Sequence, residues 1–149
     1  MKSPPAPAHP EIVSTRLLPV PRDRVFAAYS DPVALARWWG PKKFTNVFHE
    51  FDFRPGGAWR FTMRGPDGAS HKMDQRFTEI VAPERIVVRH IQQAHDFLLT
   101  MTFAERAGGT EVTWRMRFDD PAEGARLRDF LVVANGENLD RLAAHLSAP

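Results

Sequence analysis

The chain has 149 residues, of which 43% are hydrophobic and 26% charged, and this balance is typical of a globular domain with a real core. It has no cysteine, which excludes disulfides, thiolate nucleophiles and cysteine-bound zinc and suits a reducing compartment. Basic residues are scattered, so the net charge of +2 does not indicate a nucleic-acid-binding stripe, and no apolar run approaches the roughly 18–20 residues that span a bilayer. We therefore expect a cytoplasmic protein.

The N-terminus predicts a tail followed by a strand. Residues 1–10, MKSPPAPAHP, are proline-rich and lack the apolar stretch of a secretory signal, so we expect them to be disordered. One domain is expected over residues 11–149. Its first strand is predicted over residues 11–18 and is ended by Pro19 and Pro21.

Two short helices are predicted next. Residues 25–29 place apolar side chains at helical spacing. Asp31 can then cap a second helix that has Pro32 in its first turn and stops before Gly40. Together the two helices are expected to form a compact corner.

From residue 47 to residue 118 the hydrophobic period changes to two. Apolar and polar residues alternate in AWRFTMR (58–64), KMDQRF (72–77) and TEVTWRMRF (110–118), and turn sequences rich in glycine and proline separate the runs. Short strands with one apolar face predict a meandering antiparallel sheet.

The C-terminal segment, residues 122–146, returns to helical spacing after Pro121, with two aspartates before it as possible caps. Its apolar stripe comprises Leu127, Phe130, Leu131, Ala134, Leu139, Leu142 and Leu146. A sheet with one apolar face and one long amphipathic helix cover each other, so the fold class is α+β.

The inward face of this predicted fold suggests a pocket, because it is rich in large aromatic residues and methionines and is interrupted by polar groups. Burying Gln75, His90 or Asn135 without a partner would cost roughly 1–3 kcal/mol each, so a partly wet pocket or a ligand is expected to satisfy them. The candidate ligand-binding residues are Trp38, Trp59, Phe61, Met63, Met73, Gln75, Phe77, His90, Met101, Phe103, Trp114, Met116, Phe130 and Asn135.

Five stretches of sequence also resemble a known family: VPRDRVF (20–26), DP (31–32), RWWGP (37–41), FRPGGAWR (53–60) and IVAPERI (80–86). The chain is similar to the activator of Hsp90 ATPase homologue (AHSA-type) branch of the START-related, polyketide cyclase (SRPBCC) superfamily. The resemblance implies a helix-grip fold of six to seven strands around the last helix. Where the family commonly has an aromatic residue after a glycine of that helix, this chain has Glu137, which we expect to point to solvent.

Catalytic signals are weak. None of the six histidines has a recognised metal-ligand spacing, and no nucleophile elbow or phosphate loop is present, so we expect neither a metal nor a cofactor. The best acid–base candidate is His90, assisted by Gln75, because a histidine buried among aromatic residues favours its neutral form.

Three functions remain open at this stage. The first is binding of a small apolar or aromatic molecule between sheet and helix. The second is a cyclase- or hydrolase-type enzyme that orients a bound substrate. The third, which the resemblance implies, is a partner of a chaperone in the stress response. Exposed sheet edges allow either a monomer or a homodimer.

Overall fold

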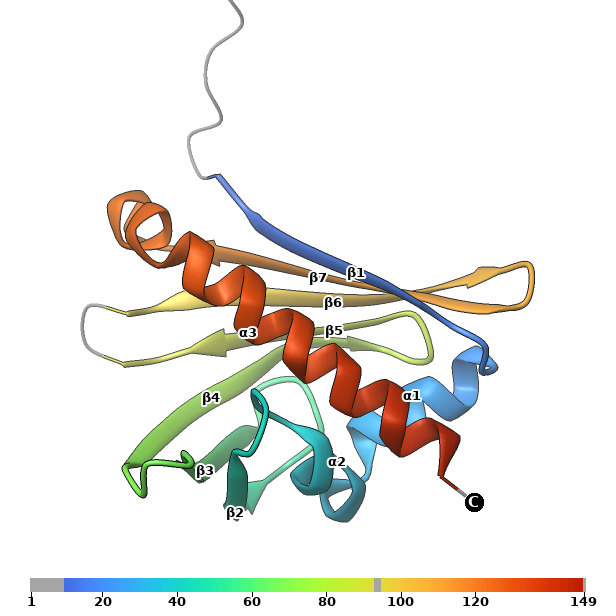
Figure 1. Ribbon diagram of the computed structural model, residues 1–149, viewed down its shortest axis with the longest axis horizontal. Helices are drawn as coiled ribbons and strands as arrows, with labels where there is room; N and C mark the ends of the chain where they lie inside the picture. The colour runs from blue at the N-terminus through green and yellow to red at the C-terminus, as the bar shows by residue number, and fades with distance from the viewer. Residues whose placement is uncertain (1–9, 93–94, 149) are drawn as a thin grey trace, which may run out of the picture.

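The computed structural model describes residues 10–92 and 95–148 and shows one antiparallel sheet covered on one face by helices (Figure 1). The sheet has seven strands in the order β1-β7-β6-β5-β4-β3-β2. In chain order the elements are β1 (Ile12–Leu18), α1 (Arg22–Ser30), α2 (Pro32–Trp38), β2 (Thr45–Phe51), β3 (Ala58–Arg64), β4 (Ser70–Val81), β5 (Arg85–His90), β6 (Phe97–Arg106), β7 (Gly109–Phe118) and α3 (Pro121–Ser147). The predicted α+β helix-grip fold is confirmed. The predicted tail lies almost entirely outside the described residues.

Helix starts follow the predicted capping chemistry. The Asp31 side chain accepts a hydrogen bond from the Val33 backbone N–H at 3.0 Å, and Asp120 does the same for Ala122 at 3.0 Å. In both helices a proline follows the cap directly, where its missing N–H is not needed. Local chemistry therefore fixes where α2 and α3 begin.

Strand registers place the predicted alternation on the inner face. Gln75 pairs with Trp59 on one side and with His90 on the other, and His90 pairs with Phe97, so one row crosses four strands. Side chains two residues apart share a face. The pairing of β4 with β5 shifts by one residue between Phe77 and Glu79. Beyond this irregularity the alternation of inward and outward side chains along β4 starts anew.

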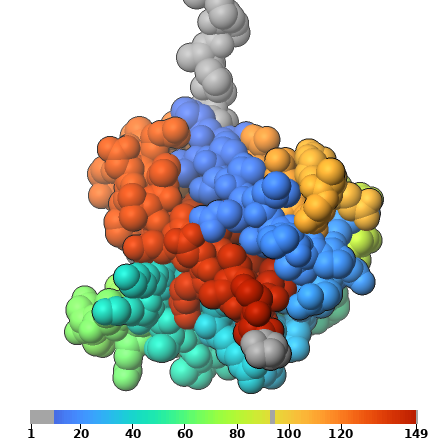
Figure 2. Space-filling model, turned by 45° about the vertical axis from the view of Figure 1, so that its right-hand side comes forward, coloured from blue at the N-terminus to red at the C-terminus, as the bar shows by residue number. Residues whose placement is uncertain are grey.

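Helix α3 runs diagonally across the inner face and lies beside β1 (Figures 1 and 2). Arg16 of β1 links the two elements: its guanidinium forms a 2.6 Å ion pair with Asp140 and donates to the Gly136 carbonyl oxygen at 3.4 Å. The buried residues of α3 begin only at Ala134, so its C-terminal half is buried more deeply than its N-terminal half, whose Leu127 and Leu131 are only partly buried against the core.

The densest part of the core is aromatic and lies where the helical corner meets the sheet. Phe26 and Tyr29 of α1 each make an edge contact with Phe103, with ring centroids 5.8 and 4.8 Å apart. On the other side of this region Trp59 stacks on Phe61 at 5.0 Å. Such contacts add to the free energy gained by burying the rings.

We predict that Gly136→Ala stabilises the protein by about 0.5–1 kcal/mol, because alanine forms helix more readily than glycine. A Cβ built at Gly136 meets no atom within 4 Å, whereas one at Gly124 comes within 3.2 Å of the Phe118 ring. Gly124→Ala is therefore a matched control with a smaller gain. Urea denaturation measures both, and a loss of stability in Gly136→Ala would contradict the prediction.

Candidate functional site

A cavity of about 370 Å³ lies between the inner face of the sheet and the N-terminal half of α3. Its lining combines large apolar side chains with a few amides and histidines. The lining residues are Trp39, Gly40, Pro41, Phe44, Met63, His71, Met73, Gln75, Gln92, His95, Phe97, Leu99, Trp114, Met116, Phe118, Leu127, Phe130, Leu131, Ala134, Asn135 and Asn138. Among these described residues no lysine, arginine, aspartate or glutamate contributes to the wall.

The sheet wall follows directly from strand alternation. Positions two apart on β4 bring His71, Met73 and Gln75 to the same face, and β6 and β7 contribute further apolar residues in the same way. Leu99 and Met116 face each other across β6 and β7 and form the floor. Regular alternation therefore builds this wall without any special loop.

The helix wall comes from one face of α3. Leu127, Leu131, Ala134 and Asn138 recur at three- and four-residue spacing and all line the cavity. Phe130 also lines it but is 66% exposed, which places this ring at the rim.

A third wall is the segment between α2 and β2, which Arg141 of α3 holds in place. One guanidinium nitrogen, Nη1, donates to the carbonyl oxygens of Trp39, Gly40 and Pro41 at 3.0, 3.0 and 3.1 Å. The other, Nη2, donates to the Arg37 carbonyl oxygen at 2.9 Å, and burial lowers the pKa of Arg141 below its ordinary value. This one side chain therefore binds one carbonyl of α2 and three carbonyls of the segment that follows it, and so positions the wall.

Glu137, the residue that departs from the family pattern, contacts this same segment. Its Oε1 accepts a hydrogen bond from the Lys42 backbone N–H at 3.4 Å. The side chain is thus half-buried against the 40–43 turn and does not point simply to solvent as expected.

Two tryptophans bound the cavity on the side of the dense core. The rings of Trp39 and Trp114 lie 5.2 Å apart, and Trp39 also contacts Trp59, at 5.0 Å. Trp114 is fixed by a hydrogen bond from its Nε1 to the Tyr29 hydroxyl at 3.0 Å, and burial raises the pKa of Tyr29 above its ordinary value. The cavity therefore ends at a rigid aromatic boundary.

The polar part of the wall centres on His90, which is 2% exposed. Its Nδ1 lies 3.2 Å from Gln75 Oε1 and its Nε2 lies 2.9 Å from Gln92 Oε1, while its ring stacks on Phe97. Burial lowers the pKa of His90, against an opposing effect from Gln92. A neutral imidazole has one N–H and one acceptor nitrogen. Gln92 is exposed, so its amide can turn to donate to Nε2 while Nδ1–H donates to Gln75.

An ionic cluster marks the rim where the segment before β6 meets the first turn of α3. His95 Nδ1 contacts Glu123 Oε1, and Arg126 Nη2 donates to the same oxygen at 2.6 Å. These contacts, above all that with Arg126, lower the pKa of Glu123. They connect the loop to the helix beside the cavity opening.

The predicted ligand-binding residues fall into two groups. The structure brings seven of them to the cavity: Met63, Met73, Gln75, Trp114, Met116, Phe130 and Asn135. The other seven do not line it: Trp38, Trp59, Phe61, Phe77, His90, Met101 and Phe103. They are buried in the core, and His90 sits behind Gln75. They face inward as predicted, but aromatic side chains of the helical corner fill the space in front of several of them.

Sequence reasoning missed several lining residues. Trp39, Gly40, Pro41 and Phe44 lie in a segment without periodicity, and His95 follows a strand end, so no pattern marked them as inward-facing. The one available signal was composition, because two adjacent tryptophans before a glycine and a proline are unusual in a surface loop.

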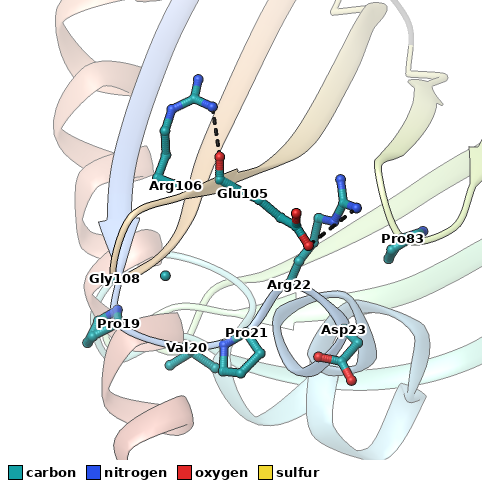
Figure 3. Close-up of a pocket in the computed structure, with 10 residues that line it drawn as sticks. Pro19, Val20, Pro21, Arg22, Asp23, Pro83, Glu105, Arg106 and Gly108 are labelled. Atoms are coloured by element: carbon teal, nitrogen blue, oxygen red, sulfur yellow. Dashed lines mark hydrogen bonds and ion pairs between the residues drawn. The ribbon is translucent and has the colours of Figure 1, made fainter.

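A second hollow, of about 490 Å³, lies between the N-terminal end of α1 and the turn that joins β6 to β7, and it is more open to solvent (Figure 3). Prolines and glycines form much of it, and none of the predicted site residues is there. Its charged groups pair only in part: Arg22 Nη2 lies 3.6 Å from Glu105 Oε1, Arg106 donates to the Glu105 carbonyl oxygen at 2.9 Å, and the buried Arg22 Nε has no hydrogen-bond partner among the described residues. We therefore take the apolar cavity as the candidate site.

The described residues contain no group of three or more His, Cys, Asp or Glu that could hold a metal ion. Within the same residues no helix is long and apolar enough to cross a membrane.

Comparison with known proteins identifies the family. The sequence profile of the Activator of Hsp90 ATPase homolog 1-like proteins matches residues 19–147, nearly the whole of the fold described above. The chain belongs to this family. The AHSA-type resemblance seen in the sequence is thereby confirmed.

Solved structures agree with this AHSA-type assignment. A protein of Chromobacterium violaceum is 28% identical, with a TM-score of 0.82 over 93% of this chain and 98% of that one. A protein of Arthrobacter aurescens is 23% identical, with a TM-score of 0.85 over 93% and 87%. An AHSA1 protein of Silicibacter pomeroyi is 20% identical, with a TM-score of 0.77 over 93% and 98%. The last two show a shared fold only. No curated protein sequence matches the chain.

We predict that Arg141→Leu lowers the free energy of unfolding by roughly 1–3 kcal/mol, because four carbonyl oxygens lose a partly buried donor. Arg128→Leu is the matched control, since Arg128 is exposed and makes one 3.4 Å bond to the Glu11 carbonyl oxygen. Urea denaturation compares the two. Equal losses would show that Arg141 does not hold the wall.

We predict that His90 makes stability fall in mild acid. Its pKa is lowered in the folded state, so below the ordinary value of about 6.5 the unfolded chain binds a proton that the folded protein does not. The free energy of unfolding therefore decreases as pH falls through this window and is unaffected by His90 above it. His90→Gln should have a shallower dependence between about pH 7.5 and 5.5 in urea denaturation. An unchanged slope would contradict the prediction.

Proposed function

We propose that this family member binds a small, compact, largely apolar or aromatic molecule in the cavity between the sheet and α3. The observation that carries the proposal is the cavity itself. Its volume of about 370 Å³ lies within the range of ligand sites, and its wall has their usual composition of large apolar groups with a few convergent polar ones.

The alternative of an ordinary packing defect is disfavoured by size and polarity. Protein interiors hold few voids larger than one water molecule, and empty cavities are lined by apolar groups. Here Gln75, Asn135 and Asn138 are each less than 10% exposed and line the space. Placing amides around a hollow is more typical of a binding site than of a core.

Two further observations favour binding over catalysis or a chaperone partnership. His90, the acid–base candidate, is separated from the cavity by Gln75, to which it is hydrogen-bonded, and its pKa is lowered, so it offers no direct proton transfer to a ligand. The family name refers to a chaperone ATPase. The feature that supports a function in this chain is the cavity between the sheet and α3, which is an internal space and not an outer docking surface.

We predict that the wild-type protein binds the two-ring hydrocarbon 2-isopropenylnaphthalene and that Ala134→Phe weakens this binding at least about tenfold. Ala134 is 7% exposed and lines the cavity, so a phenyl group there occupies the ligand's space. NMR titration measures the dissociation constant and shows which backbone amides shift.

Val133→Phe is the matched control, because the neighbouring Val133 is 63% exposed and does not line the cavity. It should bind the probe as the wild type does. Thermal denaturation of both variants verifies folding. Absence of binding to the wild type, or equal binding to both variants, would contradict the proposal.

A further inference from the structure

Gln75 presents an unused hydrogen-bond donor at the cavity wall. Four buried side-chain polar atoms lack a hydrogen-bond partner among the described residues, and of these only Gln75 Nε2 belongs to a residue that lines this cavity. The residue is 2% exposed, so bulk solvent does not satisfy this group. Leaving a buried donor without a partner is costly, and proteins rarely do so.

The orientation of the Gln75 amide is set by His90, which lies on the side of Gln75 away from the cavity. Gln75 Oε1 lies 3.2 Å from His90 Nδ1, and the strand register places the two residues directly opposite each other. Both ring nitrogens of His90 face an amide oxygen, because Gln92 Oε1 lies 2.9 Å from Nε2, and burial lowers the pKa of His90, which favours the imidazole with a single N–H. With that N–H on Nδ1, it donates to Gln75 Oε1, and the exposed Gln92 amide turns so that its NH2 group donates to Nε2. Gln75 therefore keeps its oxygen toward His90 and leaves its NH2 group available.

The charges around the cavity restrict the group that this donor can meet. The described lining residues include no lysine or arginine; of the two histidines, His95 is paired with Glu123 and His71 is exposed, so a carboxylate or phosphate buried beside Gln75 would have no permanent counter-ion. A neutral acceptor, such as the oxygen of a ketone, ester or amide, accepts one hydrogen bond at little desolvation cost. The surrounding Met73, Phe97 and Leu99 suit the apolar part of such a molecule.

We propose that Gln75 is the specificity-determining residue of the cavity and selects a neutral apolar molecule that carries a carbonyl-type acceptor, which receives a hydrogen bond from Gln75 Nε2. This inference rests on the proposed function and adds the chemical class of the ligand. His90 is a positioning residue, because it acts only by orienting the Gln75 amide.

The test uses two probes of nearly the same shape, 2-acetylnaphthalene and 2-isopropenylnaphthalene, in which a CH2 group replaces the carbonyl oxygen. Their dissociation constants are measured by NMR for the wild type and for Gln75→Met, which keeps the length of the side chain without its donor. Taking the ratio of the two constants removes the difference in hydrophobicity between the probes. We expect Gln75→Met to shift this ratio about tenfold against the ketone.

A direct readout accompanies the ratio: the side-chain NH2 resonances of Gln75 should shift strongly with the ketone and weakly with the hydrocarbon. Lys72→Met is the matched control, because Lys72 lies exposed on the outer face of the same strand, and it should keep the wild-type ratio.

The outcomes separate this inference from the proposed function. If neither probe binds the wild type, the proposed function fails and this inference with it. If both bind and Gln75→Met leaves the ratio unchanged, the inference alone is overturned. Tighter binding of 2-naphthoate than of the ketone would overturn the assignment of a neutral ligand. If the wild type prefers the alcohol 1-(2-naphthyl)ethanol to the ketone, and Gln75→Met loses this preference, Gln75 acts as an acceptor and its assignment as a donor is overturned.

Discussion

The structure depends on one constraint: a single helix must cover the apolar face of a curved seven-stranded sheet. Helix α3 meets this requirement unevenly, since its fully buried residues begin at Ala134 and the preceding turns are only partly buried against the sheet. At the C-terminal end the two short helices fill the remaining space with aromatic rings. At the N-terminal end of α3 no such helices cover the sheet among the described residues, and the space left between sheet and helix is the cavity. The site is thus a consequence of how the face is covered and needs no dedicated element.

Polarity inside this volume is organised in layers. The Gln75 amide faces the cavity, His90 lies behind it, and exposed Gln92, which also lines the cavity, contacts the other nitrogen of the His90 ring. Each layer constrains the next, because a neutral imidazole can satisfy only one acceptor and one donor. In the same way, Arg141 organises a set of backbone carbonyls from behind the opposite wall. The two walls are therefore held by buried polar groups that do not themselves face the ligand space.

Sequence patterns were sufficient for the fold, and half of the predicted ligand-binding residues do line the cavity. Alternation in β3, β4 and β7 correctly placed Met63, Gln75 and Trp114 on the inner face, and caps at Asp31 and Asp120 located two helix starts. Alternation states which face a side chain occupies, but it contains no distance to the helix above. Whether an inward side chain lies in the filled core or lines the cavity depends on that distance. Phe61 and Met73 are paired on neighbouring strands, yet Phe61 lies in the core and Met73 lines the cavity.

The tryptophan boundary described above has a consequence for the length of what can enter. Trp39 packs against both Trp59 and Trp114, and the Trp114 ring is anchored through Tyr29, so these rings close the cavity on the side of the dense core. A fatty acyl tail would have to displace this stack before it could extend further. Under the proposed binding function, this boundary favours short fused-ring compounds over long-chain lipids.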